Sequence, residues 1–113
     1  TRNNSTYIAG FVVAVKNATA FDQNPSLPAV NSTHLAFTFN STVTYSTSDY
    51  NDTIIGVATT CHLEYPIWYG LTSLSNAGGE FADAYTVASS PLTNAKATVQ
   101  MGEYTGLTVF AVH

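Results

Sequence analysis

Charged residues are scarce in this sequence. Asp, Glu, Lys and Arg make up 9% of the 113 residues, against about 25% in a typical soluble domain. The only fixed cations are Arg2, Lys16 and Lys96, which are too few to neutralise a phosphate backbone or to hold the chain on an anionic membrane surface. The composition therefore disfavours binding of nucleic acid and of anionic membranes.

Cysteine is almost absent as well. Cys61 is the only one, so no internal disulfide framework can stabilise the fold. We expect a buried free thiol, because Cys61 shares the strand parity of Ile55 and Val57, and an intermolecular disulfide is the alternative. No apolar run reaches the length of a transmembrane helix. The sequence starts at Thr1, which fits a mature chain whose signal peptide has been removed and fits a trimmed chain equally well.

What the sequence does contain is alternation of apolar and polar residues with a period of two. The range 31–45 places its large apolar residues on one parity and its polar residues on the other, which is typical of a half-buried strand. The ranges 53–65 and 95–101 alternate in the same way. The range 80–88 also favours a strand, although its alanines would tolerate one or two helical turns.

Two further segments are apolar on both parities. The ranges 7–15 and 104–112 therefore predict strands that are covered on both faces. A long connection is expected over 16–32, and a second loop over 46–52. With seven or eight short strands and no convincing amphipathic helix, the sequence predicts an all-β protein, a β-sandwich of Ig-like or jelly-roll type. We expect the sandwich to span 16–113, after a leader and candidate donor strand at 1–15.

N-glycosylation sequons are more frequent than chance. Ser and Thr occupy 27 of the 113 positions, a frequency that predicts about two sequons among the nine asparagines. Six are present, at Asn3, Asn4, Asn17, Asn31, Asn40 and Asn51. A Thr-rich β protein could produce some of them by accident, but their number indicates a secreted glycoprotein. All six lie in the first 51 residues, which predicts sugars over one part of the surface and a bare remainder.

No catalytic constellation of comparable strength is present. Cys61 and His62 are neighbours on a predicted strand, so their side chains point to opposite faces and cannot meet without a bulge. Two carboxylate pairs could serve a glycosidase, although solvated charge explains them equally well: Glu80 with Asp83, and Glu64 with Glu103. We predict no enzymatic activity, and a small secreted hydrolase is the distant alternative.

The three histidines form a weak metal signal. His34 and His62 fall on the solvent parity of neighbouring predicted strands and could share an ion with His113, but the spacing is not that of a metal motif. We therefore predict neither a metal site nor a cofactor. The aromatic group Tyr65, Trp68 and Tyr69 could stack on a sugar, and packing at a strand end is the alternative interpretation.

Assembly is the remaining possibility. The segment 7–15 follows a polar leader and needs cover on both faces, so it could leave its own domain and complete the sheet of another copy by β-strand addition. An ordinary central strand is the alternative. The residues that would fill the neighbour's pockets are Tyr7, Ile8, Ala9, Phe11, Val12, Val13 and Val15.

With its sequons from Asn3 to Asn51, its donor-like segment 7–15, its lone Cys61 and its low charge, the chain resembles subunits of archaeal extracellular filaments of the thread and bundling-pilus kind. The resemblance implies a charge-poor β-domain that links head to tail by donating an N-terminal strand. It also implies that an intersubunit isopeptide bond, if one forms, would use the amine of Lys16 or Lys96.

The sequence thus predicts a secreted structural subunit of a filament, a homopolymer held by donor-strand complementation at the archaeal cell surface. A secreted carbohydrate-binding module that uses Tyr65, Trp68 and Tyr69 is the alternative.

Overall fold

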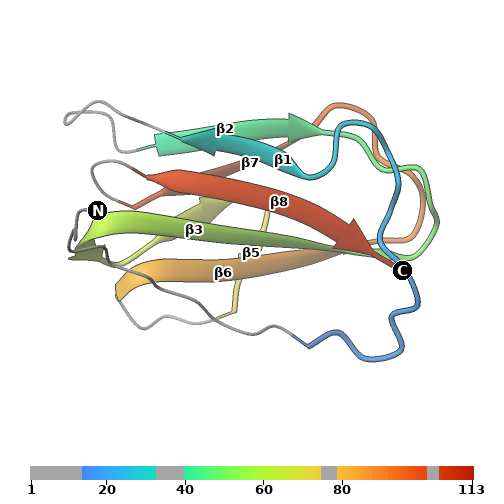
Figure 1. Ribbon diagram of the computed structural model, residues 1–113, viewed down its shortest axis with the longest axis horizontal. Coiled ribbons are helices and arrows are strands. Elements are labelled where there is room, and N and C mark those ends of the chain that lie inside the picture. The colour runs from blue at the N-terminus through green and yellow to red at the C-terminus, as the bar shows by residue number, and fades with distance from the viewer. Residues whose placement is uncertain (1–13, 33–39, 75–78, 102–104) are drawn as a thin grey trace, which may run out of the picture.

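The chain folds as a β-sandwich with no helix in the part that the computed structural model describes, residues 14–32, 40–74, 79–101 and 105–113. Figure 1 shows the strands aligned with the long axis of the molecule. The eight strands are β1 (Ala29–Ser32), β2 (Asn40–Tyr45), β3 (Asp52–Glu64), β4 (Ile67–Tyr69), β5 (Thr72–Ser73), β6 (Gly79–Ala88), β7 (Ala95–Gln100) and β8 (Gly106–Val112). The all-β prediction and the β-sandwich are confirmed.

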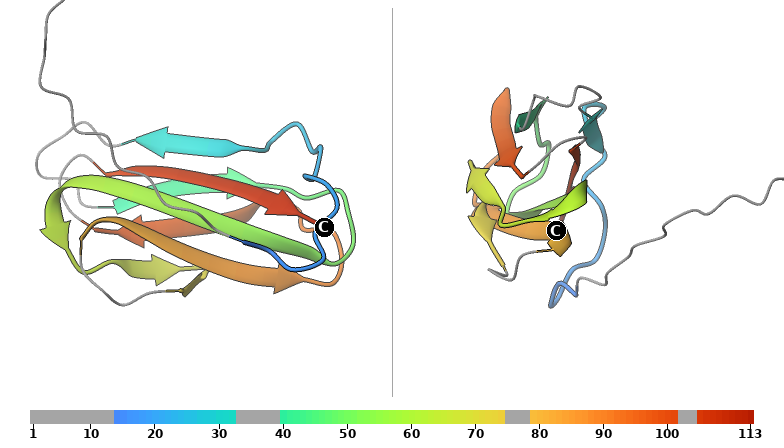
Figure 2. Two further views of the ribbon diagram at one scale, coloured as in Figure 1. Left: turned by 60° about the horizontal axis from the view of Figure 1, so that its bottom comes forward. Right: turned by 90° about the vertical axis from the view of Figure 1, so that its left-hand side faces the viewer.

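The strands form two antiparallel sheets, which Figure 2 shows stacked on one another. The larger sheet has the order β1-β8-β3-β6-β5, and the smaller has the order β2-β7-β4. The long strand β3 lies at the centre of the larger sheet, where Ile55 pairs with Tyr85 of β6 on one side and with Phe110 of β8 on the other. The pairing of β3 with β6 shifts between Thr59 and Glu64, as at a β-bulge.

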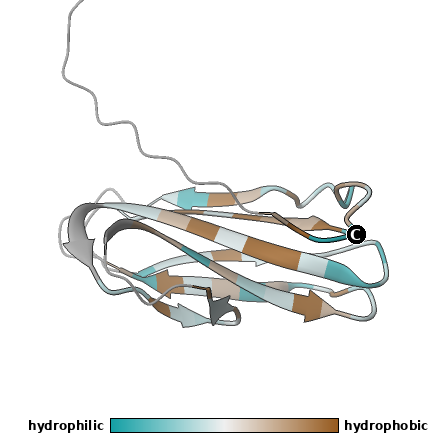
Figure 3. Ribbon diagram, turned by 90° about the horizontal axis from the view of Figure 1, so that it is seen from below, coloured by the Kyte–Doolittle hydropathy of each residue, from teal (hydrophilic) through white to brown (hydrophobic). Residues whose placement is uncertain are grey.

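The core lies between the inner faces of the two sheets. Ile54, Val99 and Val109 are completely inaccessible, and Tyr45 is nearly so. Figure 3 shows the hydrophobic bands that recur along the long strands. Trp68 of β4 points inward toward Gly56 of β3, because a Cβ atom at Gly56 would lie 3.1 Å from the Trp68 ring. Small residues on the inner face of the larger sheet thus make room for large ones from the smaller sheet.

The turns use residues that tolerate a left-handed backbone. Asn17, Asn51 and Asn94 have φ values of 64°, 60° and 52°, a conformation in which asparagine is enriched over other non-glycine residues. Gly70, between β4 and β5, has a φ of 86°, and the carbonyl oxygen of Lys96 occupies the space that a Cβ atom would need. Only glycine fits that turn without strain.

Three details differ from the sequence prediction. The range 31–45, expected as one strand, contains the end of β1 in the larger sheet and the whole of β2 in the smaller sheet, while residues 33–39 lie outside the described residues. The connection expected over 16–32 ends in a strand, because β1 pairs with β8 from Ala29 to Ser32. In β3 the parity that faces the core is that of Ile54 and Ala58, whereas Ile55 and Val57 belong to the outer face. Alternation misplaced the core side because both faces of β3 carry apolar residues. The side chain of Cys61 lies outside the described residues.

The two outer faces differ in chemistry. The outer face of the smaller sheet is polar on β2 and β7, where Thr42 and Thr98 share a hydrogen bond of 2.7 Å and Lys96 donates to Thr44. The outer face of the larger sheet is mixed on β3 and β8, where Thr53, Thr59 and Thr108 share the outer parity. On β6 it carries an apolar strip of exposed residues, Phe81, Tyr85 and Val87. Exposed faces of antiparallel sheets are commonly polar, so this strip is unusual.

No helix of a length and apolarity that could span a bilayer occurs in the part of the chain that the structure describes.

Candidate functional site

The described sequons all present an exposed asparagine. Asn17 and Asn51 lie in turns, and both line one shallow hollow beside Val112. Asn40 begins β2, on the outer face of the smaller sheet. Asn31 lies on β1 and its amide donates to the carbonyl oxygen of Thr42 at 2.9 Å. Asn3 and Asn4 lie outside the described residues.

The candidate donor strand lies almost wholly outside the described residues. Of the segment 7–15, only Ala14 and Val15 are described. They belong to no strand, and Val15 is half-buried against the hollow that contains Asn17. Residues that follow are tied to the end of β8, because the backbone N–H of Ala20 donates to the carbonyl oxygen of His113 and the N–H of His113 donates to that of Ala20.

The three aromatic residues of the alternative sugar platform do not share a surface. Tyr65 and Tyr69 are exposed, by 77% and 54%. Trp68 instead points into the sandwich and packs against the core. Adjacent residues of β4 face opposite sides of the sheet, and this separates the rings of Trp68 and Tyr69.

Most of the residues considered for chemistry cannot be placed. His34 and Glu103 lie outside the described residues, as do the side chains of Cys61, His62, Glu64 and Glu80. Asp83 is half-buried on the outer face of β6. Of the two lysines considered for an isopeptide bond, Lys16 lies exposed in a turn and Lys96 donates to Thr44 Oγ1 at 3.2 Å.

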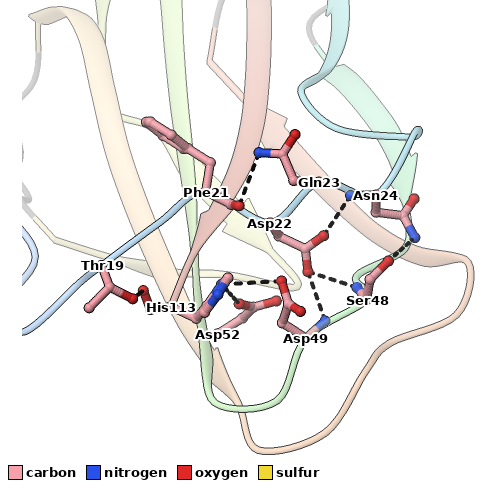
Figure 4. A network of polar contacts seen from close by, with 9 residues as sticks. All are labelled: Thr19, Phe21, Asp22, Gln23, Asn24, Ser48, Asp49, Asp52 and His113. Atoms are coloured by element: carbon pink, nitrogen blue, oxygen red, sulfur yellow. Dashed lines mark hydrogen bonds and ion pairs between the residues drawn. The ribbon is translucent and has the colours of Figure 1, made fainter.

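A polar cluster that the sequence did not predict joins three distant segments at one end of the sandwich, as Figure 4 shows. Asp22 is its centre and is only 5% exposed. One carboxylate oxygen accepts the backbone N–H of Asn24 at 2.7 Å, and the other accepts those of Ser48 and Asp49 at 2.7 and 3.0 Å. Asp22 thereby holds the loop between β2 and β3 against the segment that precedes β1.

Hydrogen bonding decides the charge of Asp22. Burial by itself would raise the pKa of this carboxyl, but the neighbouring Asp52 carboxyl and the three backbone N–H donors outweigh it and lower the pKa below its ordinary value. Asp22 is therefore an ionised buried carboxylate, and its charge acts on the groups around it.

Asp52, the first residue of β3, is the least solvated member of the cluster. It is fully inaccessible, and neither carboxylate oxygen receives a donated hydrogen bond among the described residues. Burial, followed by a hydrogen bond that protonated Asp52 can donate to the Asp22 carboxylate and by the charges of Asp22 and Asp49, raises the pKa of Asp52 to about 7, while His113 opposes the rise. Such a side chain is costly unless a proton or a cation neutralises it.

His113 follows β8 and closes the cluster. Its Nδ1 atom lies 3.2 Å from Asp49 Oδ2 and 3.5 Å from Asp52 Oδ1, yet it is buried and makes no well-formed hydrogen bond. Donor atoms of Asp49, Asp52 and His113 lie within 4.8 Å of one another. Two carboxylates and one imidazole nitrogen thus lie close together at this end of the sandwich.

Local sequence patterns do not predict this cluster. Asp49 and Asp52 lie three residues apart in a loop, but Asp22 and His113 come from remote parts of the chain. Of the three histidines considered for a metal, His113 is the one whose surroundings the structure describes. The only local signal is an aspartate at the start of a strand whose next large side chains, Ile54 and Ile55, are apolar.

A second candidate site is the exposed edge of β6. The neighbouring strand β5 pairs only with Tyr85 and Ala84, with one further hydrogen bond from Leu74 to Asp83. Past this short strand lies an open hollow of about 390 Å³, lined by the end of β6, Gly70 and Leu92 among others. An edge of this kind can accept another strand.

Comparison with known proteins gives no relative: no family model, no curated protein and no solved structure matches this chain.

Proposed function

We propose that this chain is a structural subunit of a secreted, N-glycosylated extracellular filament or pilus, in which each copy donates the segment 7–15 to its neighbour. The observation that carries the proposal is the strip of exposed apolar side chains on the outer face of β6, formed by Phe81, Tyr85 and Val87.

The apolar strip on β6 offers a surface for another copy. Along β6, Phe81, Tyr85 and Val87 are 39%, 37% and 64% exposed, and on β8 the ring of Phe110 packs against the exposed Phe21 in a tilted arrangement, with ring centroids 5.9 Å apart. Asp83 is the only charged side chain among the described residues of the outer face. Full burial of one large apolar side chain stabilises a complex by about 1.5–3 kcal/mol, so a contact here favours association.

The edge of β6 supports strand donation as the form of that association. The side chains of a strand added there would alternate between the two sides of the larger sheet. One set would enter the hollow beside Gly70 and Leu92, and the other would extend the apolar strip past Val87. This suits the segment 7–15, which is apolar on both parities, because the side chains on each side of the added strand would contact apolar residues.

None of the four described sequons lies on β5 or β6. Asn31 and Asn40 lie on β1 and β2, away from that edge. Asn17 and Asn51 lie in turns beside Val112, and the backbone N–H of Asn51 donates to the carbonyl oxygen of Ser89 just after β6, so a sugar on Asn51 would border the proposed contact. Protein glycosylation would also replace charge as the source of solubility.

The test is removal of the donor segment followed by its return as a peptide. We expect the full chain to form polymers that light scattering and electron microscopy detect, and the variant lacking residues 1–15 to stay monomeric. A synthetic peptide of residues 7–15 should bind the truncated chain and raise its melting temperature. The control peptide carries Phe11→Ser and Val13→Ser, which keep the length and remove the apolar side chains.

Two results would contradict the proposal. One is a full chain that remains monomeric at high concentration and keeps its stability after truncation. The other is equal binding of the wild-type and control peptides. Sugar binding by the truncated chain that is lost when the exposed Tyr65 and Tyr69 are replaced by Ala would favour the carbohydrate-binding alternative instead.

A further inference from the structure

The cluster at the end of the sandwich contains donor atoms that the protein itself leaves unsatisfied. Asp52 is fully buried, and neither its carboxylate oxygens nor the buried Nδ1 atom of His113 makes a well-formed hydrogen bond among the described residues, although Asp22 and His113 are close polar neighbours of Asp52. A buried polar atom without a partner costs about 1–3 kcal/mol, and a charged one costs more. Because the Asp52 carboxylate and the His113 imidazole face one another, a cation bound by both would remove this cost.

The distances fit a metal ion. Nδ1 of His113 lies 3.2 Å from Asp49 Oδ2 and 3.5 Å from Asp52 Oδ1. Two ligand atoms that each lie about 2.0–2.2 Å from one ion in tetrahedral or octahedral geometry are about 3.0–3.5 Å apart. Two of the three donor pairs therefore already have the separations of a coordination shell, and because all three donors lie within 4.8 Å of one another, a small rotation of an aspartate side chain would complete it.

The donor types select the kind of ion. Calcium and magnesium prefer all-oxygen shells, whereas an imidazole nitrogen with carboxylates suits zinc and its first-row neighbours. We propose that Asp49, Asp52 and His113 bind one divalent transition-metal ion, for which Zn²⁺ is the natural probe. Asp49 and His113 are about one-third exposed at their side chains, which gives the ion a path from solvent.

Asp22 positions the site without being a ligand. Both of its oxygens already accept backbone N–H groups, including that of Asp49. This fixes the loop that carries Asp49 beside the start of β3. Its negative charge also lies close to Asp52, which favours a cation in the cluster.

A bound ion would link segments that are far apart in the sequence. It would join the loop between β2 and β3 to the residue after β8. The carbonyl oxygen of His113 in turn accepts the backbone N–H groups of Thr19 and Ala20, so the ion would also secure the segment that precedes β1. We expect a structural role for the ion, because Asp52 is fixed by its pairing with Ala88 of β6 and His113 by its backbone hydrogen bonds with Ala20.

The test is Zn²⁺ binding to the full, untagged chain after treatment with a chelator. We expect calorimetry to show a site that is lost in Asp52→Asn and in His113→Gln, and the melting temperature of the wild type to rise with Zn²⁺ while that of each variant does not. Asp52→Asn preserves shape, and circular dichroism establishes that it folds. Asp83→Asn, on the outer face of β6, is the matched control and should bind like the wild type.

Cys61 and the other histidines could bind Zn²⁺ on their own, so the number of ions matters. Each site variant should bind one ion fewer than the wild type, whereas His62→Gln should not remove the same site. The proposal is overturned if the wild type binds neither Zn²⁺ nor Mn²⁺, if Asp52→Asn and His113→Gln bind the same number of ions as the wild type, or if Ca²⁺ binds while Zn²⁺ does not. This outcome is independent of filament formation, because the ligands lie outside residues 1–15.

Discussion

His113 and Asp52 face one another across the end of the sandwich, with Nδ1 of the imidazole 3.5 Å from Oδ1 of a carboxylate that has no access to solvent. One residue follows β8 and the other begins β3, and the two strands are neighbours in the larger sheet. The pair therefore lies where the end of β8 meets the start of β3.

The first prediction concerns pH. In the metal-free chain the pKa of Asp52 is raised from 3.8 to about 7, so the folded state binds this proton more tightly than the unfolded state. The resulting stability is full below about pH 4 and is lost as pH rises through 7. Asp22, whose pKa is lowered, is ionised in both states above about pH 5 and adds no slope there. We expect the free energy of unfolding to fall by about 2 kcal/mol from about pH 5 to about pH 7.

Urea unfolding in the presence of a chelator measures this slope, and Asp52→Asn is its control. The amide cannot ionise, so the variant should lose most of the decline and be more stable than the wild type near neutral pH. Parallel pH profiles for the two proteins would show that Asp52 is not the titrating group.

The second prediction concerns Asp22. Replacement by Ala leaves the backbone N–H groups of Asn24, Ser48 and Asp49 without their acceptor. Each hydrogen bond to a charged group contributes about 1.5–3 kcal/mol, and solvent can replace part of that. We expect Asp22→Ala to lower the free energy of unfolding by about 2–4 kcal/mol, measured by denaturant titration. Asp22→Asn should lose less, because the amide oxygen still accepts; equal losses would contradict the role of the acceptor.

The third prediction concerns assembly through β6. Val87 is 64% exposed, so Val87→Lys should leave the monomer folded. It would place a charge on the apolar strip next to the edge that accepts the donor segment, and we expect polymers to disappear in light scattering. Gln100→Lys adds the same charge to the outer face of the smaller sheet without altering any sequon, and it should polymerise as the wild type does. Loss of polymers in both variants would assign the effect to net charge rather than to the face.

The fourth prediction compares replacement by Ala at Gly70 and at Gly106, which differ in the space available for a Cβ atom. Ala at Gly70 needs a left-handed backbone and overlaps the Lys96 carbonyl, so we expect a loss of about 2 kcal/mol or more in thermal or chemical unfolding. Gly106→Ala places its Cβ 3.4 Å from Thr59 Oγ1, an ordinary contact, and should change stability by less than about 1 kcal/mol. A smaller loss at Gly70 than at Gly106 would contradict the turn geometry.

The fifth prediction concerns glycosylation. Mass spectrometry of the native glycoprotein should find sugar on Asn40, which is exposed on the outer face of β2. At Asn51 the backbone is left-handed, so Asn51→Gln would add strain to the loss of the glycan. Thr53→Val removes this sequon and keeps a β-branched residue on β3, and it should abolish the Asn51 glycan with little change in stability. An unmodified Asn40 in the native material would contradict the sugar-bearing face.

Local pattern predicted the strands better than it predicted their faces. The alternation at 53–65, 80–88 and 95–101 corresponds to β3, β6 and β7, because a period of two reports an extended backbone whichever side is buried. It could not tell which parity of β3 faces the core, since Ile54 and Ile55 are both buried. Strand β1 was not recognised as separate, and its last two residues were merged with β2 in one predicted strand over 31–45, because four residues of mixed polarity carry no periodic signal.

The sequence by itself determined that the chain is a charge-poor, sequon-rich β protein, since composition and alternation depend only on which residues are present and in what order. Tertiary structure alone decided that Asp22, Asp49, Asp52 and His113 meet, and that the apolar parity of β6 faces outward. The reason is physical: these relationships depend on which strands pair and in which register, and pairing between remote segments is fixed by packing of the whole core rather than by any local stretch.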